Sequence, residues 1–382
     1  MKGQIFLVSI LFLGFNSLKA DIQKKIYKTC KVDYQIVIDG CMEEEAWDMV
    51  EWGDSFIQRF PYEGENPSQK TAFKILYDDN NLYVFIRAFD TNPDKIAPIL
   101  SRRDYFTGDW VEINIDSDHD QQTAFSFTAM ASGVKGEEAI SNDGNNWDSS
   151  WNPVWYLKTT RNNKGWNAEM CIPFSQLRFA NQDKHVWGIQ IQRYLFRKQE
   201  RSLWQLIPQD APGWVHLFGE LHGIKNIKPR HQIDLLPYTV GKTEFFEKES
   251  GNPYADGSSN SISGGLDGKI GVTSDLTLDF TLNPDFGQVE ADPSVVNLTA
   301  FETYYSEQRP FFVEGKNIYQ FYPSDVIVIN NFNRDNLFYS RRIGRAPQYY
   351  PDLDDDEYAD VPEATTILGA FKLSGKTKKG IS

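Results

Sequence analysis

Residues Thr71–Ala88 read TAFKILYDDNNLYVFIRA, in which two apolar runs flank a polar turn of Asp and Asn. Almost every residue of the second run, Leu82–Ala88, is apolar, which is typical of a strand covered on both faces. Many strands at near-regular spacing with turn residues between them predict an antiparallel β-sandwich of jelly-roll or immunoglobulin-like type. Similar runs recur across residues 33–228 at Gln35–Asp39, Thr71–Tyr77, Trp110–Asp116, Thr123–Ala129, Val154–Thr159, Trp166–Ile172 and Gly188–Tyr194. Only Glu43–Val50 has helical spacing.

Residues 232–382 carry a different pattern. Ser274–Asn283 places Leu276, Leu278, Phe280 and Leu282 on one face and polar residues on the other. Strict alternation over ten residues suits a tilted transmembrane strand of about 9–11 residues, and equally an amphipathic strand of a soluble sheet. Ser263–Val272, Gln232–Gly241 and Thr365–Lys376 are further strand candidates, and a long irregular segment separates the last two strands in the sequence.

Composition excludes several classes of protein. Hydrophobic residues make up 40% and aromatic residues 14% of the 382 positions, too many for a disordered chain. The formal net charge of −14 argues against nucleic-acid partners, whose phosphates require a basic surface. The length favours two or three domains.

The first twenty residues have the pattern of a signal peptide. Lys2 precedes an apolar run from Ile5 to Phe15, and the small residue Ala20 stands at the expected cleavage point. We therefore expect export. Of the three cysteines, Cys30 and Cys41 could pair in an oxidising compartment, and two inert buried thiols fit the sequence as well.

No catalytic motif stands out. The chain lacks H-E-x-x-H, G-x-S-x-G and P-loop sequences, and its five His have no ligand spacing. We therefore expect a chain that is not an enzyme, with no catalytic residues. A label of hydrolase acting on O-glycosyl bonds would rest on family association alone.

A cluster of tryptophans with Asp and Asn suggests saccharide binding. Indole rings stack on the apolar CH faces of sugars, while carboxylates and amides bond to the hydroxyl groups. The alternative is that several of these indoles fill the sandwich core. The predicted carbohydrate-binding residues are Trp110, Trp147, Trp151, Trp155, Asn146 and Asp148.

An alternation of carboxylates offers one candidate metal site. Asp116, Asp118 and Asp120 have the spacing that calcium ligands use, which makes calcium the one candidate cofactor. The segment is no EF-hand, because Gln121 stands where that loop has Gly. An Asp-rich hairpin turn explains the same residues, and both interpretations stay open.

Four segments resemble the family 9 carbohydrate-binding modules, a DOMON-like sandwich, in the right order. These are IVIDG and EEEAW at residues 36–40 and 43–47, LYDDNNLYV at 76–84, GDWVEINID at 108–116 and WNAEMCIPF at 166–174. The resemblance covers residues 33–228. It implies a sandwich fold and a polysaccharide or glycan as partner.

Later segments resemble a family of uncharacterised outer-membrane proteins of Bacteroidetes-type bacteria. The segments are LNPDFGQVEADP at residues 282–293, VNLTAFET at 296–303, RPFFVEG at 309–315 and YSRRIG at 339–344. In that family a sandwich precedes a large C-terminal β-barrel. The resemblance therefore implies an outer-membrane location, with residues 232–382 expected to form the start of a truncated barrel that holds a long irregular insertion.

Together these observations predict an all-β, exported envelope protein. Residues 1–20 would be a signal peptide, residues 33–228 a periplasmic or cell-surface glycan-binding sandwich, and residues 232–382 incomplete barrel strands in the outer membrane. The setting would be carbohydrate catabolism, with further protein partners in the envelope. The alternative is a structural or transport protein whose sandwich is a plug or docking module, or an accessory to O-glycosyl hydrolysis.

Overall fold

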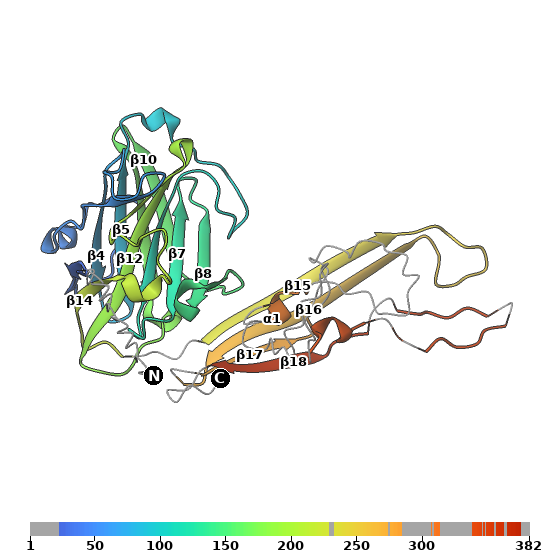
Figure 1. The fold of residues 1–382 in the computed structure, drawn as a ribbon. Helices are drawn as coiled ribbons and strands as arrows, with labels where there is room; N and C mark the ends of the chain where they lie inside the picture. Colours follow the sequence, from blue (N-terminus) through green and yellow to red (C-terminus); the bar gives the residue numbers. More distant parts are fainter. Residues whose placement is uncertain are drawn as a thin grey trace, which may run out of the picture.

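The computed structural model is built almost entirely from β-strands arranged in three sheets (Figure 1). It describes residues 23–228, 233–273, 276–284, 307, 309–313, 338–345, 347, 349–354, 357–362 and 365–375. The predicted signal peptide at residues 1–20 and most of the irregular segment between Asn283 and Gln348 lie outside these residues. No helix in the described ranges is long and apolar enough to cross a membrane.

The first two sheets pack face to face as the predicted sandwich. The nine-stranded sheet has the order β1-β14-β12-β6-β7-β8-β9, with β13 paired to β12 and β3 paired to β13. Its bounds are β1 Ile26–Lys28, β3 Ile57–Phe60, β6 Trp110–Asp116, β7 Ala124–Met130, β8 Lys135–Ser141, β9 Asn146–Asp148, β12 Lys184–Leu195, β13 Glu200–Leu203 and β14 Gly219–Lys225. The five-stranded sheet has the order β10-β11-β5-β4-β2, formed by β2 Cys30–Lys31, β4 Thr71–Tyr77, β5 Asn81–Phe89, β10 Tyr156–Asn162 and β11 Gly165–Pro173.

A large apolar core lies between these two sheets. It includes Phe73 and Ile86 from the five-stranded sheet and Ile113, Phe127 and Ile191 from the nine-stranded sheet, all fully buried. Since successive strand residues point to opposite faces, the alternate residues of each strand are left for the outer faces. The core thus fixes which side chains can form a surface site.

Most predicted strands are confirmed, including the pair around the Asp and Asn turn. The predicted strand Gln35–Asp39 is wrong: the segment is irregular, and Ile36 is buried in a second cluster on the outer face of the five-stranded sheet. Glu43–Val50 contains only a short 3-10 helix, Glu45–Met49. The strand β8 was not foreseen, because its sequence, KGEEAIS, has few apolar residues.

The third sheet has the order β15-β16-β17-β18 and is antiparallel throughout. Its strands are β15 Ile233–Phe245, β16 Ser258–Gly271, β17 Leu276–Leu282 and β18 Gly369–Gly375. Two short helical segments accompany it, α1 Pro310–Val313 and a 3-10 turn at Ser340–Arg342. In Figure 1 this sheet extends away from the sandwich as a separate body.

The register of the third sheet separates apolar from charged residues. One cross-strand row joins four aliphatic side chains, Ile233, Ile270, Leu278 and Leu373. The adjacent row, one residue along and on the opposite face, joins Asp234, Lys269, Asp279 and Lys372. The sheet is therefore apolar on one face and charged on the other.

The sandwich core gives a first prediction. Phe127 packs edge-on against Trp151 and Trp155, with ring centroids 5.5 and 5.4 Å away. Phe127→Ala should lower the free energy of unfolding by about 3–5 kcal/mol, since it leaves a cavity in the core. All ten tryptophans lie between Trp47 and Trp214, so tryptophan fluorescence of the full chain in a urea titration reports on the sandwich.

The matched control is Tyr62→Ala. Tyr62 is 69% exposed, and its removal should change the same free energy by no more than about 0.5 kcal/mol. Equal unfolding midpoints for the two variants would contradict the position assigned to Phe127.

Candidate ligand-binding site

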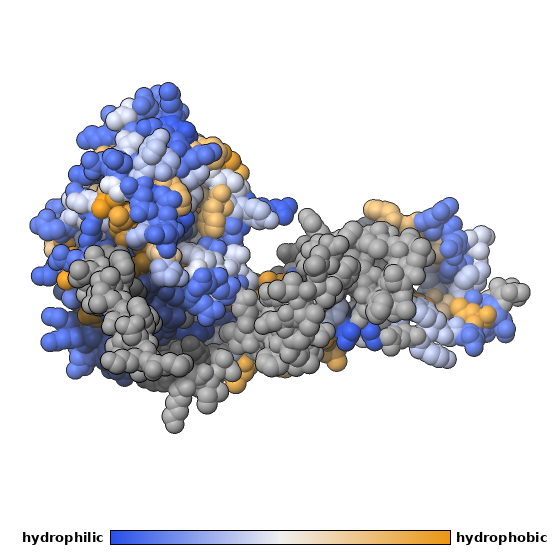
Figure 2. Space-filling model, in the orientation of Figure 1, coloured by the Kyte–Doolittle hydropathy of each residue, from blue (hydrophilic) through white to orange (hydrophobic). Residues whose placement is uncertain are grey.

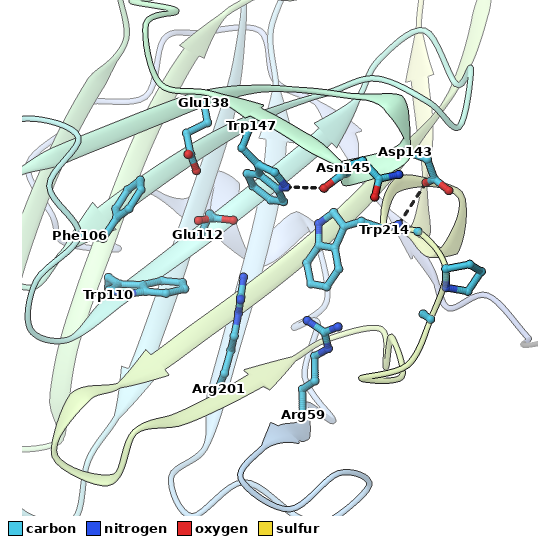
Figure 3. Close-up of a pocket in the computed structure, with 14 residues that line it drawn as sticks. Arg59, Phe106, Trp110, Glu112, Glu138, Asp143, Asn145, Trp147, Arg201 and Trp214 are labelled. Carbon is cyan, nitrogen blue, oxygen red and sulfur yellow. Dashed lines mark hydrogen bonds between the residues drawn. The ribbon is translucent and has the colours of Figure 1, made fainter. Parts of the chain in front are cut away.

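A pocket of about 470 Å³ opens on the outer face of the nine-stranded sheet. Along β6, Val111, Ile113 and Ile115 belong to the core. The alternate residues Trp110 and Glu112 therefore point outward and line the pocket. Figure 3 shows them together with Glu138 from β8, Trp147 from β9, Arg201 from β13, Arg59 from β3, and the turn that carries Trp214.

Three indoles and a phenyl ring form the aromatic part of the pocket. The Trp110 ring stacks on Tyr194 at 5.5 Å and lies 6.4 Å from Phe106. Trp147 and Trp214 lie 6.2 Å apart at an interplanar angle of 58°. The Trp214 Nε1 group donates to Asn114 Oδ1 at 3.0 Å, and the Trp147 Nε1 group donates to the Gly144 carbonyl at 2.8 Å. These bonds fix the orientation of both rings.

Two arginines face the indoles. The Arg201 guanidinium lies 5.7 Å from the Trp110 ring centroid and 5.5 Å from that of Trp214, and its Nε donates to Gln192 Oε1 at 2.6 Å. The Arg59 guanidinium lies 5.0 Å from the Trp214 centroid. Burial lowers the pKa of both arginines, and the positive charge of Arg201 lowers the pKa of Arg59 further.

Two glutamates of the pocket differ in their surroundings. Glu112 accepts hydrogen bonds from Asn114 Nδ2 at 2.6 Å, Thr128 Oγ1 at 2.8 Å and Gln192 Nε2, so its carboxylate is held by the sheet itself. Burial, followed by the charge of Glu112, raises the pKa of Glu138 to about 7. Glu138 therefore changes its charge near neutral pH.

One aspartate ties the two turns of the pocket together. Asp143 lies between Asn142 and Gly144 in a run of left-handed backbone, with φ values of 51°, 55° and 89°. Its Oδ1 accepts from the amides of Trp214 and His216 at 3.2 and 3.0 Å, and its Oδ2 lies 2.6 Å from His216 Nδ1. A Cβ on Gly144 would come within 2.3 Å of Trp214 Cβ, so only glycine allows this approach.

The structure brings together two of the six predicted carbohydrate-binding residues. Trp110 and Trp147 line the pocket. Trp151 packs against Phe125 at 4.8 Å, and Trp155 is 2% exposed with its Nε1 donating to Glu137 at 3.1 Å. These two indoles belong to the core side of the sheet, so their positions correct the prediction that they stack on a sugar.

The two predicted polar ligands on β9 have local partners. Asn146 Nδ2 donates to Ser141 Oγ at 3.1 Å, and Asp148 Oδ1 accepts from the amide and hydroxyl of Ser150 at 3.0 and 2.5 Å. Neither residue lines the pocket. Arg59, Glu112, Glu138, Arg201 and Trp214 do line it and were missed. Of these five residues, only Trp214, in the turn after Pro212 and Gly213, could have been found from the sequence, because it is a tryptophan like the predicted sugar-binding residues.

The aspartates proposed for calcium cap a turn. Asp116 accepts from the amides of Asp120 and Gln121 at 3.2 and 3.0 Å, and Asp120 accepts from the amides of Gln122 and Thr123 at 2.8 and 2.7 Å. Burial raises the pKa of Asp116 to about 7. In the part of the chain that the structure describes, no group of three His, Cys, Asp or Glu residues is placed to hold a metal ion. The geometry therefore fits the Asp-rich turn. Cys30, Cys41 and Cys171 are free thiols.

Comparisons with known proteins divide the chain into the same two parts. Residues 38–204 match the family model "Carbohydrate family 9 binding domain-like", which confirms the resemblance stated for the sandwich. Residues 229–382 match the model "Domain of unknown function (DUF5916)". No curated protein matches the chain.

Solved structures similar to this chain include a family 9 carbohydrate-binding module of Caldicellulosiruptor kristjanssonii. Its complex with glucose is 20% identical, with a TM-score of 0.38, and the match covers 54% of this chain and 97% of that one. Its complex with cellotriose is 21% identical, with a TM-score of 0.38, over 54% and 95% of the two chains. A putative carbohydrate-binding protein of Bacteroides uniformis is 13% identical, with a TM-score of 0.44, over 53% and 100%.

The tie made by Asp143 gives a second prediction. Asp143→Ala should lower the free energy of unfolding by about 1–3 kcal/mol, because the amides and the imidazole that it accepts from lose a charged partner. Hydrogen exchange at the amides of Trp214 and His216 should become faster. Asp79→Ala is the control, since Asp79 is 68% exposed in its ion pair with Lys31 and such pairs contribute about 0–1 kcal/mol. Unchanged hydrogen exchange at the amides of Trp214 and His216 would contradict the hydrogen bonds assigned to Asp143.

Proposed function

We propose that this chain binds a carbohydrate in the pocket formed by Trp110, Trp147 and Trp214. The observation that carries the proposal is the convergence of three oriented indoles with charged and polar groups in one cavity. Indole faces attract the CH faces of a sugar ring, and the polar groups between them suit its hydroxyls. The match of residues 38–204 to a carbohydrate-binding family model supports the same assignment.

The size of the pocket fits this role. A cavity of about 470 Å³ lies inside the range of about 300–1,000 Å³ for small-ligand sites. Glu112 is fully engaged by the sheet, so its role is to orient Gln192 and Asn114 rather than to attack a substrate. The proposed function is therefore binding of a saccharide without catalysis of a reaction. We propose that this binding contributes to carbohydrate catabolism.

The central test is calorimetry of the full chain with xylan, glucan and host-type oligosaccharides. Trp110→Ala and Trp147→Ala should each lower the affinity at least tenfold, because about 1–3 kcal/mol of stacking per ring is lost. Trp151→Phe is the matched control: it keeps the aromatic contact with Phe125 and should leave the affinity unchanged. The proposal fails if none of the saccharides binds, or if Trp151→Phe abolishes binding as fully as Trp147→Ala.

We propose further that the third sheet lies in the outer membrane, in accord with the expected export of the chain. Support comes from its exposed apolar side chains: Ile233, Leu235, Phe371 and Leu373 are each more than half exposed. The sandwich, in contrast, is predominantly hydrophilic on the surface seen in Figure 2. An apolar face that is left uncovered suits contact with lipid.

The opposite face supports the same location. Lys372 Nζ lies 3.5 Å from Asp279 Oδ2, and Asp279 is 6% exposed. Lys372 also donates to the Phe311 carbonyl at 3.1 Å, so α1 lies on this charged face. In a soluble sheet the apolar face would be the covered one, whereas transmembrane strands turn it outward.

A matched pair of variants tests this location. Leu278→Arg places a charge in the apolar row, at a cost of about 2–4 kcal/mol near the bilayer midplane, whereas Thr277→Arg places it on the polar face. When the chain is expressed in a bacterium with two membranes, Leu278→Arg should be depleted from the outer-membrane fraction and Thr277→Arg should be retained. Recovery of the unmodified chain in the soluble fraction would contradict the proposal.

A further inference from the structure

We propose that the ligand of the pocket is an acidic saccharide, whose carboxylate is bound by the guanidinium groups of Arg59 and Arg201. The inference rests on the proposed function and names the class of sugar that the same site selects. Its basis is the convergence of two arginines from neighbouring strands on one side of the pocket.

The two guanidinium groups are held close together. β3 and β13 are paired in the nine-stranded sheet, and both arginines reach the same indole, with distances to the Trp214 centroid of 5.0 Å for Arg59 and 5.5 Å for Arg201. Burial, followed by the positive charge of Arg201, lowers the pKa of Arg59. Two like charges in a half-buried site are unfavourable unless an anion lies between or beside them.

Carboxylates of the protein do not supply that anion by direct contact. Among the described residues, neither Arg59 nor Arg201 forms a salt bridge, and the carboxylates whose charges act on Arg201 are Glu112 and Glu138. Glu112 is engaged by Asn114, Thr128 and Gln192, and Asp143 by Trp214 and His216. Glu63, the acidic neighbour of Arg59, accepts from the Gln209 amide at 2.7 Å. Glu112, Asp143 and Glu63 are thus committed to holding the fold, whereas Glu138, whose charge also acts on Arg201, has a pKa of about 7.

Donor groups remain for a ligand. Arg59 Nε is buried without a hydrogen-bond partner, while its Nη2 donates to the Pro208 carbonyl at 3.2 Å. Arg201, which lines the pocket, uses its Nε for Gln192, and the described residues accept no hydrogen bond from its two terminal nitrogens. Guanidinium groups bind carboxylates through paired N–H donors, which neutral hydroxyl groups match less well.

Glu138 makes the binding of an anion depend on pH. The charged groups around it are Glu112 on β6, Asp148 on β9, Asp104, and Arg201 on β13. Its pKa of about 7 means that Glu138 is mostly neutral at pH 6 and mostly ionised at pH 8. The ionised form repels a carboxylate and attracts Arg201, so affinity for an acidic sugar should fall by about tenfold over this interval.

The test compares pairs of acidic and neutral sugars that have the same ring structure. Calorimetry of the full chain with oligogalacturonate against oligogalactose, and with glucuronate-bearing against unmodified xylo-oligosaccharides, should show at least tenfold tighter binding of the acidic member at pH 6. Arg59→Gln should abolish this preference, and Glu138→Gln should remove its pH dependence. Arg161→Gln, at an exposed position on β10, is the control and should change neither. Sulfated oligogalactose distinguishes a carboxylate from anions in general.

Each result decides the inference. Equal affinity for acidic and neutral sugars overturns it and leaves the proposed function standing. A preference that survives in Arg59→Gln also overturns it, because Arg59 supplies the buried Nε that has no partner in the protein. Tighter binding of the sulfated sugar than of the uronate overturns the assignment to carboxylates. Binding of no saccharide overturns both proposals.

Discussion

The alternation of side chains along β6 is the constraint on which the candidate site depends. Val111, Ile113 and Ile115 must face the core to bury their apolar surface, and this leaves Trp110 and Glu112 on the outer face. A shift of one residue in register would exchange the two sets, so the free energy that packs the core also fixes the site. The sandwich therefore does more than support the pocket, because its register selects the residues that line it.

The outer face of the same sheet carries charged side chains, and the fold provides hydrogen-bond or ionic partners for some of them but not for others. Glu112 has three donors, and Asp143 has three partners that join the two turns. Arg59 and Arg201 share one indole, and among the described residues neither forms a salt bridge. Buried polar groups normally find partners within the protein, and those that do not are candidates for binding a ligand. This inequality separates the groups that hold the pocket from those that can bind within it.

Strand positions could be predicted from the sequence, but the composition of the pocket could not. Apolar runs such as Leu82–Ala88 are local signals, and they matched the strands closely. The pocket joins β3, β6, β8, β9 and β13 with two turns, and its residues are separated by up to 155 positions, from Arg59 to Trp214. Trp151 and Trp155 lie in the same Trp- and Asx-rich segment as Trp147, yet they face the core. Local composition does not say which face of a sheet a side chain takes, so the sequence could not separate them from Trp147. Arg201 lies in a four-residue strand with no periodic signal.

The most direct measurement of the central claim is a crystal structure of the full chain grown with an oligosaccharide. The account predicts a sugar ring inside the pocket, with its CH face against Trp110 or Trp147 and a polar edge toward Arg59 and Arg201. A sugar bound on another surface, with this pocket holding only solvent, would contradict it.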